Sequence, residues 1–143
     1  MGWWWTEMNE MTVRHQGGDR LEIDVRGHRV IVDQPAEVGG TDAGPTPTEL
    51  FVAGLASCVG FYAERFLRQH SLPLEGLEVR CSFAMDPGPA RVASVQLGVV
   101  VPAFLNESHR RALLAVVDHC TVHNSIRQDP EIDIGVEIHS LAA

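Results

Sequence analysis

The chain has 143 residues, of which 45% are hydrophobic and 21% charged, and its formal net charge is −8 at pH 7. This length suits one domain that buries its own core, so we expect a single domain over residues 1–143. The negative charge argues against a nucleic-acid surface, and no apolar run reaches the roughly 20 residues that span a bilayer.

The first residues, MGWWWTEMNEM, lack the basic region and the apolar core of a secretion signal. We therefore expect a cytoplasmic protein with no membrane or nucleic-acid partner. In that compartment structural disulfides are rare, and cysteines are catalytic, metal-binding or simply buried. The tryptophans at positions 3–5 either belong to a flexible tail over residues 1–10 or dock on a partner subunit.

The first third of the chain has the pattern of short strands. RLEIDVR (20–26) alternates apolar and charged residues, which is typical of a half-buried strand. QGGD before it predicts a hairpin turn, and RVIVDQ (29–34) predicts a third strand. Residues 35–46 are rich in Gly and Pro without periodicity, so we expect a loop.

A long helix follows. Thr46 is suited to cap it, Pro47 to its first position, and Glu49 completes a T-x-x-E capping box. Side chains at three- and four-residue steps form one stripe: Phe51, Gly54, Leu55, Cys58, Phe61, Tyr62 and Arg65. With Pro73 as its end, the pattern predicts a central helix that is buried on more than one side.

The second half predicts a β-β-α-α-β order. Strands are expected in LEVRCSFAM (77–85) and RVASVQLGVVV (91–101), around the turn PGPA. Asn106 caps a second helix, a third covers about Val122 to Gln128, and EIDIGVEI (131–138) alternates as a last strand. The second helix has an apolar face made of Leu113, Val116, Val117 and Cys120. Strands in hairpin groups with segregated helices indicate the α+β class.

The three cysteines have different surroundings. Cys81 alternates with apolar strand residues, which predicts packing in the core. Cys58 lies on the helical stripe among small residues, so it is either core filler or a nucleophile, and a nucleophile needs a nearby cation. Cys120 opens CTVHNSI, and it is either an apolar plug or a thiol whose pKa is lowered by a helix N-terminus.

The same residues allow a zinc site as a weak alternative. Cys120, His123 and His119 would join Cys58 around the metal. Structural zinc sites usually carry paired C-x-x-C or C-x-x-H units, however, and this chain has one such unit.

Two segments carry a resemblance to a known family. PTPTELFVAGLASCVG resembles the first-cysteine helix of the OsmC/Ohr thiol peroxidases, and CTVHNSI is similar to their second-cysteine segment. The cysteine spacing, element order and length match as well. The resemblance implies an intertwined α+β homodimer in which two long central helices are buried back to back and the active sites lie at the subunit interface.

The resemblance also implies roles for individual residues. Cys58 would be the peroxidatic nucleophile that becomes a sulfenic acid, and Cys120 would condense with it to a disulfide. A dithiol reductant, lipoyl-type or another thiol, would restore the pair, with no metal or organic cofactor. Arg20, with Arg14 in reserve, would hold the thiolate. Without the family, Arg20 is a charge on the solvent face of a hairpin strand.

Two positions depart from the family pattern. The organic-hydroperoxide branch has a Glu ten residues before its first cysteine. Thr48 stands there in this chain, and Glu49 is better explained by the capping box, although it can reach the site from its neighbouring position. Thr121 replaces the usual proline, and it is able to cap the short helix. His123 either assists proton transfer or is a surface residue.

The expected function is therefore thiol-dependent reduction of hydroperoxides, preferably apolar organic ones, in oxidative-stress defence. The alternative is a small-molecule binding protein of the same fold whose cysteines stay reduced and inert. The departures at Thr48 and Thr121 keep this alternative open.

Overall fold

The computed structural model describes residues 9–139, so the predicted tail with Trp3–Trp5 lies almost entirely outside the described residues. The chain divides into two compact units. The first comprises the residues up to Gly54 together with Cys81–Gln96, and the second comprises Leu55–Arg80 together with the residues from Leu97 onward.

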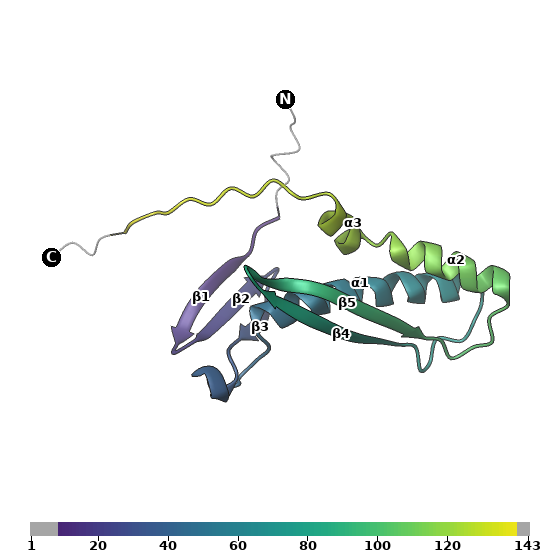
Figure 1. Cartoon of the computed structure of the whole chain (residues 1–143), viewed down its shortest axis with the longest axis horizontal. Coiled ribbons are helices and arrows are strands. Elements are labelled where there is room, and N and C mark those ends of the chain that lie inside the picture. Colours follow the sequence, from purple (N-terminus) through teal and green to yellow (C-terminus); the bar gives the residue numbers. More distant parts are fainter. Residues whose placement is uncertain (1–8, 140–143) are drawn as a thin grey trace, which may run out of the picture. The chain divides into compact units, whose positions relative to one another are not determined.

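The first unit begins with a three-stranded antiparallel sheet in the order β1-β2-β3 (Figure 1). The strands are β1 (Thr12–Gly17), β2 (Arg20–Val25) and β3 (His28–Val32). Gly17 and Gly18 have φ angles of 111° and 55°, which only glycine adopts readily, and they form the predicted turn between β1 and β2. The three strands and the hairpin turn predicted for this region are confirmed.

The loop after β3 is held by one buried carboxylate. Asp33 is 1% exposed and accepts hydrogen bonds from the backbone N–H groups of Gln34, Thr41 and Ala43. The Thr41 hydroxyl donates a further bond of 2.6 Å. Hydrogen bonds to a carboxylate favour its charged form, and these lower the pKa of Asp33 to about 2. The loop is therefore an ordered turn, which includes a short 3-10 helix, η2 (Ala36–Val38).

The long helix α1 (Pro47–Gln69) starts as predicted. Thr46 Oγ1 accepts the backbone N–H of Glu49 at 3.1 Å, and Glu49 Oε1 accepts the backbone N–H of Thr46 at 2.8 Å. The capping box is thus confirmed. At the other end Ser71 has a φ of 53°, and Leu72 N–H reaches back to the Leu67 carbonyl at 2.9 Å. This left-handed cap ends the helix before Pro73 is reached.

The buried side of α1 differs from the predicted stripe. In the single chain the buried residues lie on one face: Val52, Leu55, Val59, Ala63, Phe66 and Leu67. Phe51 and Phe61 are 49% and 50% exposed, so burial on more than one side is not observed. Both faces of α1 are apolar, and periodicity alone does not tell which of them another element of the same chain covers.

The composition of α1 also meets the criterion for a membrane span, with a mean hydropathy of 1.4 over its most apolar window. The core helix of a globular protein passes the same test. The buried face of α1 is what a core helix requires.

The strands β4 (Glu78–Pro87) and β5 (Ala90–Val100) form a two-stranded sheet around the predicted turn. Here the prediction for Cys81 is wrong, because its side chain is exposed in the single chain. Phe83 and Met85 on the same strand are exposed as well. Alternation identifies the faces of a strand correctly, but a face is buried only where another element covers it.

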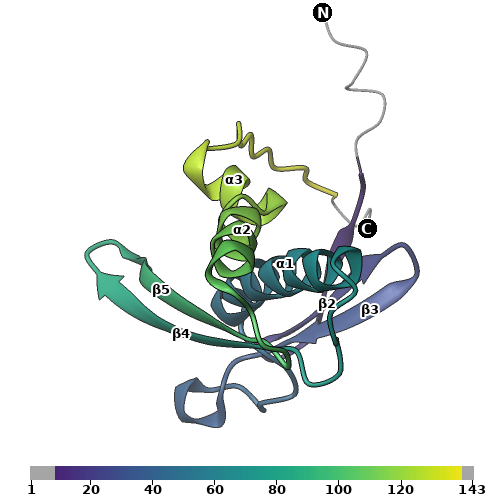
Figure 2. The ribbon, with the colours of Figure 1, turned by 90° about the vertical axis from the view of Figure 1, so that its right-hand side faces the viewer.

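The second unit contains the helices α2 (Glu107–Asp118) and α3 (Thr121–Arg127). Asn106 caps α2 as predicted, because its side chain accepts the backbone N–H of His109 at 2.7 Å. Leu113 and Val117 are buried, whereas Val116 is 37% exposed. Figures 1 and 2 both show α2 beside the later part of α1, and the rings of Phe66 and His109 lie 6.3 Å apart at one end of this contact.

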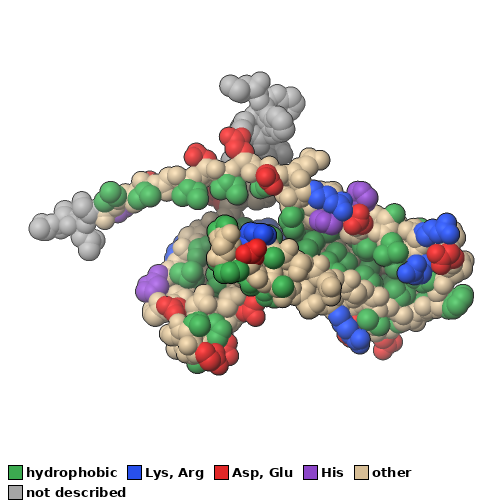
Figure 3. All heavy atoms as spheres, in the orientation of Figure 1, with side chains coloured by type: hydrophobic (Ala, Val, Ile, Leu, Met, Phe, Trp, Pro, Cys, Tyr) green, Lys and Arg blue, Asp and Glu red, His purple; other side chains and the backbone are tan. Residues whose placement is uncertain are grey.

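The predicted last strand is not formed. Residues 131–138 are extended but have no strand partner within the described chain. Their apolar row is between 75% and 88% exposed: Ile132, Ile134, Val136 and Ile138. Figure 3 shows apolar side chains in a row along this segment. The alternation is that of a strand, but a strand exists only when a second one supplies hydrogen bonds.

Candidate redox site

The structure brings two of the predicted site residues together. Cys58 is half-buried on α1, and Cys120 is fully buried directly before α3. The thiol of Cys58 lies close enough to the thiol of Cys120 to raise its pKa, and neither cysteine is in a disulfide. Cys120 reaches this place because it continues the buried side of α2, three residues after Val117 and seven after Leu113.

Cys120 itself is the N-cap of α3. Its Sγ accepts the backbone N–H of His123 at 3.4 Å. The expectation that Thr121 caps this helix is therefore wrong, because Thr121 is the first residue inside it. A sulfur can take the place of the usual oxygen acceptor at this position when it lies close to the first free N–H groups.

The pKa of Cys120 decides between its two predicted alternatives in favour of the apolar plug. Burial raises it above the usual 9.0, and the neighbouring thiol of Cys58 raises it further. The N–H groups of His123 and Val122 lower it, as expected for a helix N-terminus, but burial has the larger effect. Cys120 is therefore a protonated thiol at neutral pH.

The corner between α2 and α3 is fixed by an ion pair. The Arg127 guanidinium donates to the Asp118 carboxylate and to the Asp118 carbonyl, each at 3.0 Å. These bonds lower the pKa of Asp118. His123 is half-buried, and its Nδ1 lies 3.9 Å from Asp118 Oδ1. This places the His123 ring at the corner between α2 and α3, beside Asp118.

The alternative zinc site gains no support. Among residues 9–139 there is no group of three or more His, Cys, Asp or Glu side chains that could hold a metal ion. His119 is instead hydrogen-bonded through Nδ1 to the Ala115 carbonyl at 2.9 Å.

A contact that the sequence analysis missed lies next to the cysteines. The hydroxyl of Tyr62 is hydrogen-bonded to Thr121 Oγ1 at 2.9 Å. Tyr62 follows Cys58 by four residues on α1, and Thr121 follows Cys120 directly. The i, i+4 spacing of Cys58 and Tyr62 was a usable signal, because such residues share a helix face, but nothing in the sequence paired Tyr62 with Thr121.

The other predicted site residues belong to the first unit. Arg20 begins β2 opposite Gly17, and Arg14 lies on β1 opposite Glu22. Neither guanidinium forms an ion pair within the part of the chain that is described. Both side chains are therefore available to bind an anion, and their role at the Cys58 thiolate stays a prediction. The Glu49 carboxylate accepts the Thr46 N–H of the capping box.

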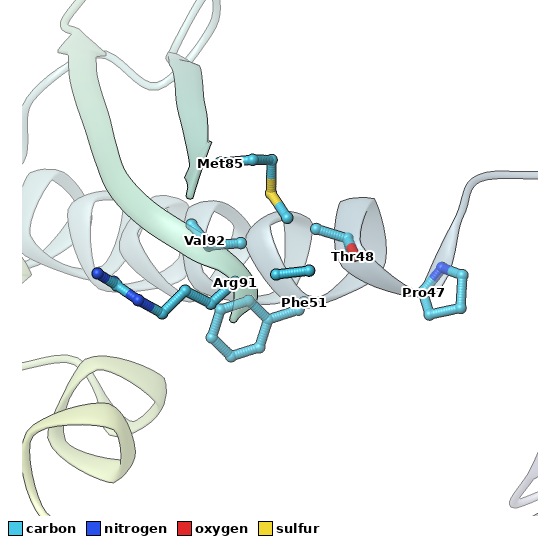
Figure 4. Close-up of a pocket in the computed structure, with 7 residues that line it drawn as sticks. Pro47, Thr48, Phe51, Met85, Arg91 and Val92 are labelled. Atoms are coloured by element: carbon cyan, nitrogen blue, oxygen red, sulfur yellow. The ribbon is translucent and has the colours of Figure 1, made fainter. Parts of the chain in front are cut away.

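The first unit also holds an open, mainly apolar pocket of about 500 Å³ (Figure 4). Its walls come from the first turns of α1 and from the β4–β5 hairpin: Pro47, Thr48, Phe51, Met85, Ala90, Arg91 and Val92. Thr48, which stands where the resemblance expects a Glu, is thus a pocket residue. Arg91 at its edge is paired with Asp86 at 3.1 Å.

Comparison with known families decides the classification. Residues 40–135 match the family model described as OsmC-like protein. The chain belongs to the OsmC family. The matched range includes both cysteines of the redox site and all of α1. No curated protein sequence matches this OsmC-family chain.

Solved structures agree with this family at the level of the fold. A candidate osmotic-stress-induced and detoxification response protein of Psychrobacter arcticus is 23% identical, with a TM-score of 0.77 over 85% of this chain and 90% of its own. An organic hydroperoxide resistance protein OsmC of Legionella pneumophila is 21% identical, with a TM-score of 0.64 and coverages of 85% and 90%. OhrB, an organic hydroperoxide resistance protein of Bacillus subtilis, is 20% identical, with a TM-score of 0.59 and coverages of 87% and 93%. The predicted α+β, OsmC-like fold is therefore confirmed.

Proposed function

We propose that this OsmC-family protein is a thiol-dependent peroxidase that reduces organic hydroperoxides in oxidative-stress defence. The observation that carries the proposal is that the Cys58 thiol lies close enough to the Cys120 thiol to raise its pKa, although the two residues are 62 positions apart in the sequence. Two free thiols at this distance can cycle between dithiol and disulfide. Two of the similar structures are of proteins named for organic hydroperoxide resistance, which supports the same chemistry.

The first step oxidises Cys58. Its thiolate attacks the outer oxygen of the hydroperoxide, the O–O bond breaks, and the alkoxide leaves and takes up a proton as the alcohol. Cys58 becomes a sulfenic acid, so the sulfur has lost the two electrons that the peroxide gained. The half-buried position of Cys58 suits this role, since the attacking sulfur has to be reached by the substrate.

The second step captures the sulfenic acid. The Cys120 sulfur attacks the Cys58 sulfur, the S–O bond breaks, and the hydroxyl leaves as water with the Cys120 proton. Because burial raises the pKa of Cys120, this residue keeps its proton until that moment. A dithiol reductant, lipoyl-type or another, then reduces the disulfide and is itself oxidised.

The cation beside the thiolate and the preferred substrate are further parts of the proposal. A thiolate needs a cation, and Arg20 is the side chain that we propose for it, with Arg14 in reserve and Glu49 as a less certain orienting group. The apolar side chains near Cys58 on α1, such as Leu55 and Phe61, support an organic hydroperoxide in preference to hydrogen peroxide. The cytoplasm, which keeps thiols reduced, is the proposed location.

We further propose a homodimer as the functional form. Exposed apolar rows on a folded chain mark interaction surfaces, and here they are Phe51 and Phe61 on α1 and the isoleucines and valine of residues 132–138. In sedimentation equilibrium we expect twice the chain mass of 15.7 kDa. Ile134→Asp should shift the protein toward the monomer, whereas Asp133→Ala, on the opposite side of the same segment, should not. A wild-type monomer at micromolar concentration would contradict the dimer.

Counting thiols tests the peroxidase proposal against the binding-protein alternative. After one equivalent of cumene hydroperoxide, the thiols titrated in denaturant should fall from three to one. The one that remains should be Cys81, identified by alkylation in denaturant and peptide mass spectrometry. A binding protein with inert cysteines would keep all three thiols. Repeated turnover with a dithiol, measured as the consumption of cumene hydroperoxide, completes the test.

A further inference from the structure

We infer that the hydrogen bond between Tyr62 and Thr121 is a positioning clasp that holds the Cys58 and Cys120 sulfurs at condensing distance. The catalytic role of this hydrogen bond rests on the proposed function. Its structural role, which is to restrain the two sulfurs, does not. All four residues lie in the second unit of the chain.

The Cys58–Cys120 pair and the Tyr62–Thr121 pair lie next to each other. On α1, Cys58 and Tyr62 are separated by one helical turn, about 6 Å along the axis. On the other side Cys120 and Thr121 are consecutive residues at the start of α3. Cys120 meets Cys58, and Thr121 Oγ1 meets the Tyr62 hydroxyl at 2.9 Å. The start of α3 is therefore attached to α1 at two neighbouring points.

The second point of attachment restricts a rotation of α3 that the first point allows. With the sulfur contact alone, the start of α3 can pivot about Cys120 and turn its Sγ away from Cys58. The Tyr62–Thr121 bond removes that rotation, because Thr121 is covalently next to Cys120. The Tyr62 ring is itself restrained, since it is half-buried and packs edge-on against Phe61 with centroids 5.4 Å apart.

Two other side-chain contacts of α3 do not restrain its position relative to α1. Arg127 ties the far end of α3 to Asp118 at the end of α2. The Ser125 hydroxyl donates to the Thr121 carbonyl at 2.9 Å, inside α3 itself. The side-chain hydrogen bond between Tyr62 and Thr121, in contrast, joins α3 to α1.

The Tyr62–Thr121 bond should affect the step in which Cys120 condenses with the Cys58 sulfenic acid. A sulfenic acid at Cys58 is captured quickly only if the Cys120 sulfur is already aligned with it. Without the clasp the sulfenic acid lives longer and a second peroxide molecule can oxidise it to the sulfinic acid. Tyr62 and Thr121 are thus positioning residues that act through the two cysteines.

The test measures the alignment directly and needs no peroxide. The Cys58–Cys120 pair is equilibrated with glutathione redox buffers in the wild type, Tyr62→Phe, Thr121→Val and the double variant. Each single variant should lose about three- to tenfold in the effective concentration of the two thiols, since one hydrogen bond contributes that much. A tenfold loss makes the reduction potential about 30 mV less negative. The double variant should be no worse than either single one, because both changes remove the same bond.

Controls separate positioning from general stability. Thr121→Ser keeps the hydroxyl and should restore the wild-type potential, and Ser125→Ala, which loses a bond inside α3, should leave it unchanged. A hydrogen bond that only stabilised the fold would weaken the reduced and the oxidised protein equally, and the potential would not move. Unchanged potentials in Tyr62→Phe and Thr121→Val would overturn the inference even if the wild type reduces peroxides. Shifted potentials in a protein without peroxide turnover would support the clasp and reject the proposed function.

Discussion

Cys58→Ser is expected to reduce cumene hydroperoxide no faster than buffer with the same dithiol does. A serine hydroxyl is almost entirely protonated at neutral pH and is a far weaker nucleophile toward the O–O bond than a thiolate. The loss should therefore be on the order of a thousand-fold or more in kcat/KM. It is measured by following hydroperoxide consumption at substrate concentrations well below KM.

Cys81→Ser is the matched control for this variant. It makes the same chemical change at a cysteine that has no part in the proposed reaction, so turnover should stay at the wild-type level. Circular dichroism and sedimentation of Cys58→Ser should match the wild type, because the site loses one sulfur from a half-buried position. Peroxidase activity retained in Cys58→Ser, or lost in Cys81→Ser, would show that the nucleophile is assigned to the wrong residue.

The second large effect is expected from Cys120→Ser. Cys58 is still oxidised in this variant, but no thiol lies beside it to form the disulfide. With excess peroxide the intact mass should rise by about 32 Da, the two oxygens of a sulfinic acid, whereas the wild type should lose about 2 Da as its disulfide forms. Turnover with a dithiol should stop after a few cycles, since the sulfinic acid is not reduced by thiols.

Trapping with dimedone distinguishes the steps. The Cys120→Ser variant should give a strong dimedone adduct on Cys58 at one equivalent of peroxide, and the wild type a weak one. A disulfide between Cys58 and Cys81 in the variant would contradict the role of Cys120, because it would mean that another thiol resolves the intermediate equally well. An adduct on Cys81 alone would contradict the role of Cys58.

Local signals in the sequence were sufficient for much of this fold. The capping box at Thr46 and Glu49, the cap at Asn106 and the glycine turn before β2 are all contacts between near neighbours. Such contacts depend on residue type and spacing, which a sequence displays directly. The strands and helices that they bound were therefore predictable to within a few residues.

Burial was less predictable, because it depends on what covers a face. Cys81 and the row at residues 132–138 have the alternation of core strands and are exposed in the single chain. The same limit applies to the face of α1 that carries Phe51 and Phe61. An apolar pattern indicates a surface that becomes buried, but it does not identify whether another element or another subunit buries it.

At the candidate site the sequence identified the cysteines but not their surroundings. The pairing of Cys58 with Cys120 came from a family resemblance. The Tyr62–Thr121 bond joins residues 59 positions apart, which no periodic pattern encodes. For Cys120 the sequence left open an apolar plug or a thiol whose pKa is lowered by the helix N-terminus. Burial raises the pKa instead, and the depth of burial is not visible in the sequence.

The hydrogen bonds to Asp33 make the stability of its loop depend on pH. A carboxylate whose pKa is about 2 when folded and 3.8 otherwise contributes its full stabilisation well above pH 4 and loses it progressively as the pH falls from there to about 2. The peptide that leads from the first sheet into α1 is therefore held together at pH values where ordinary aspartates have begun to take up protons. At pH 5 the loop therefore keeps the stabilisation from this carboxylate, and acid weakens the connection into α1 once the pH falls below about 4.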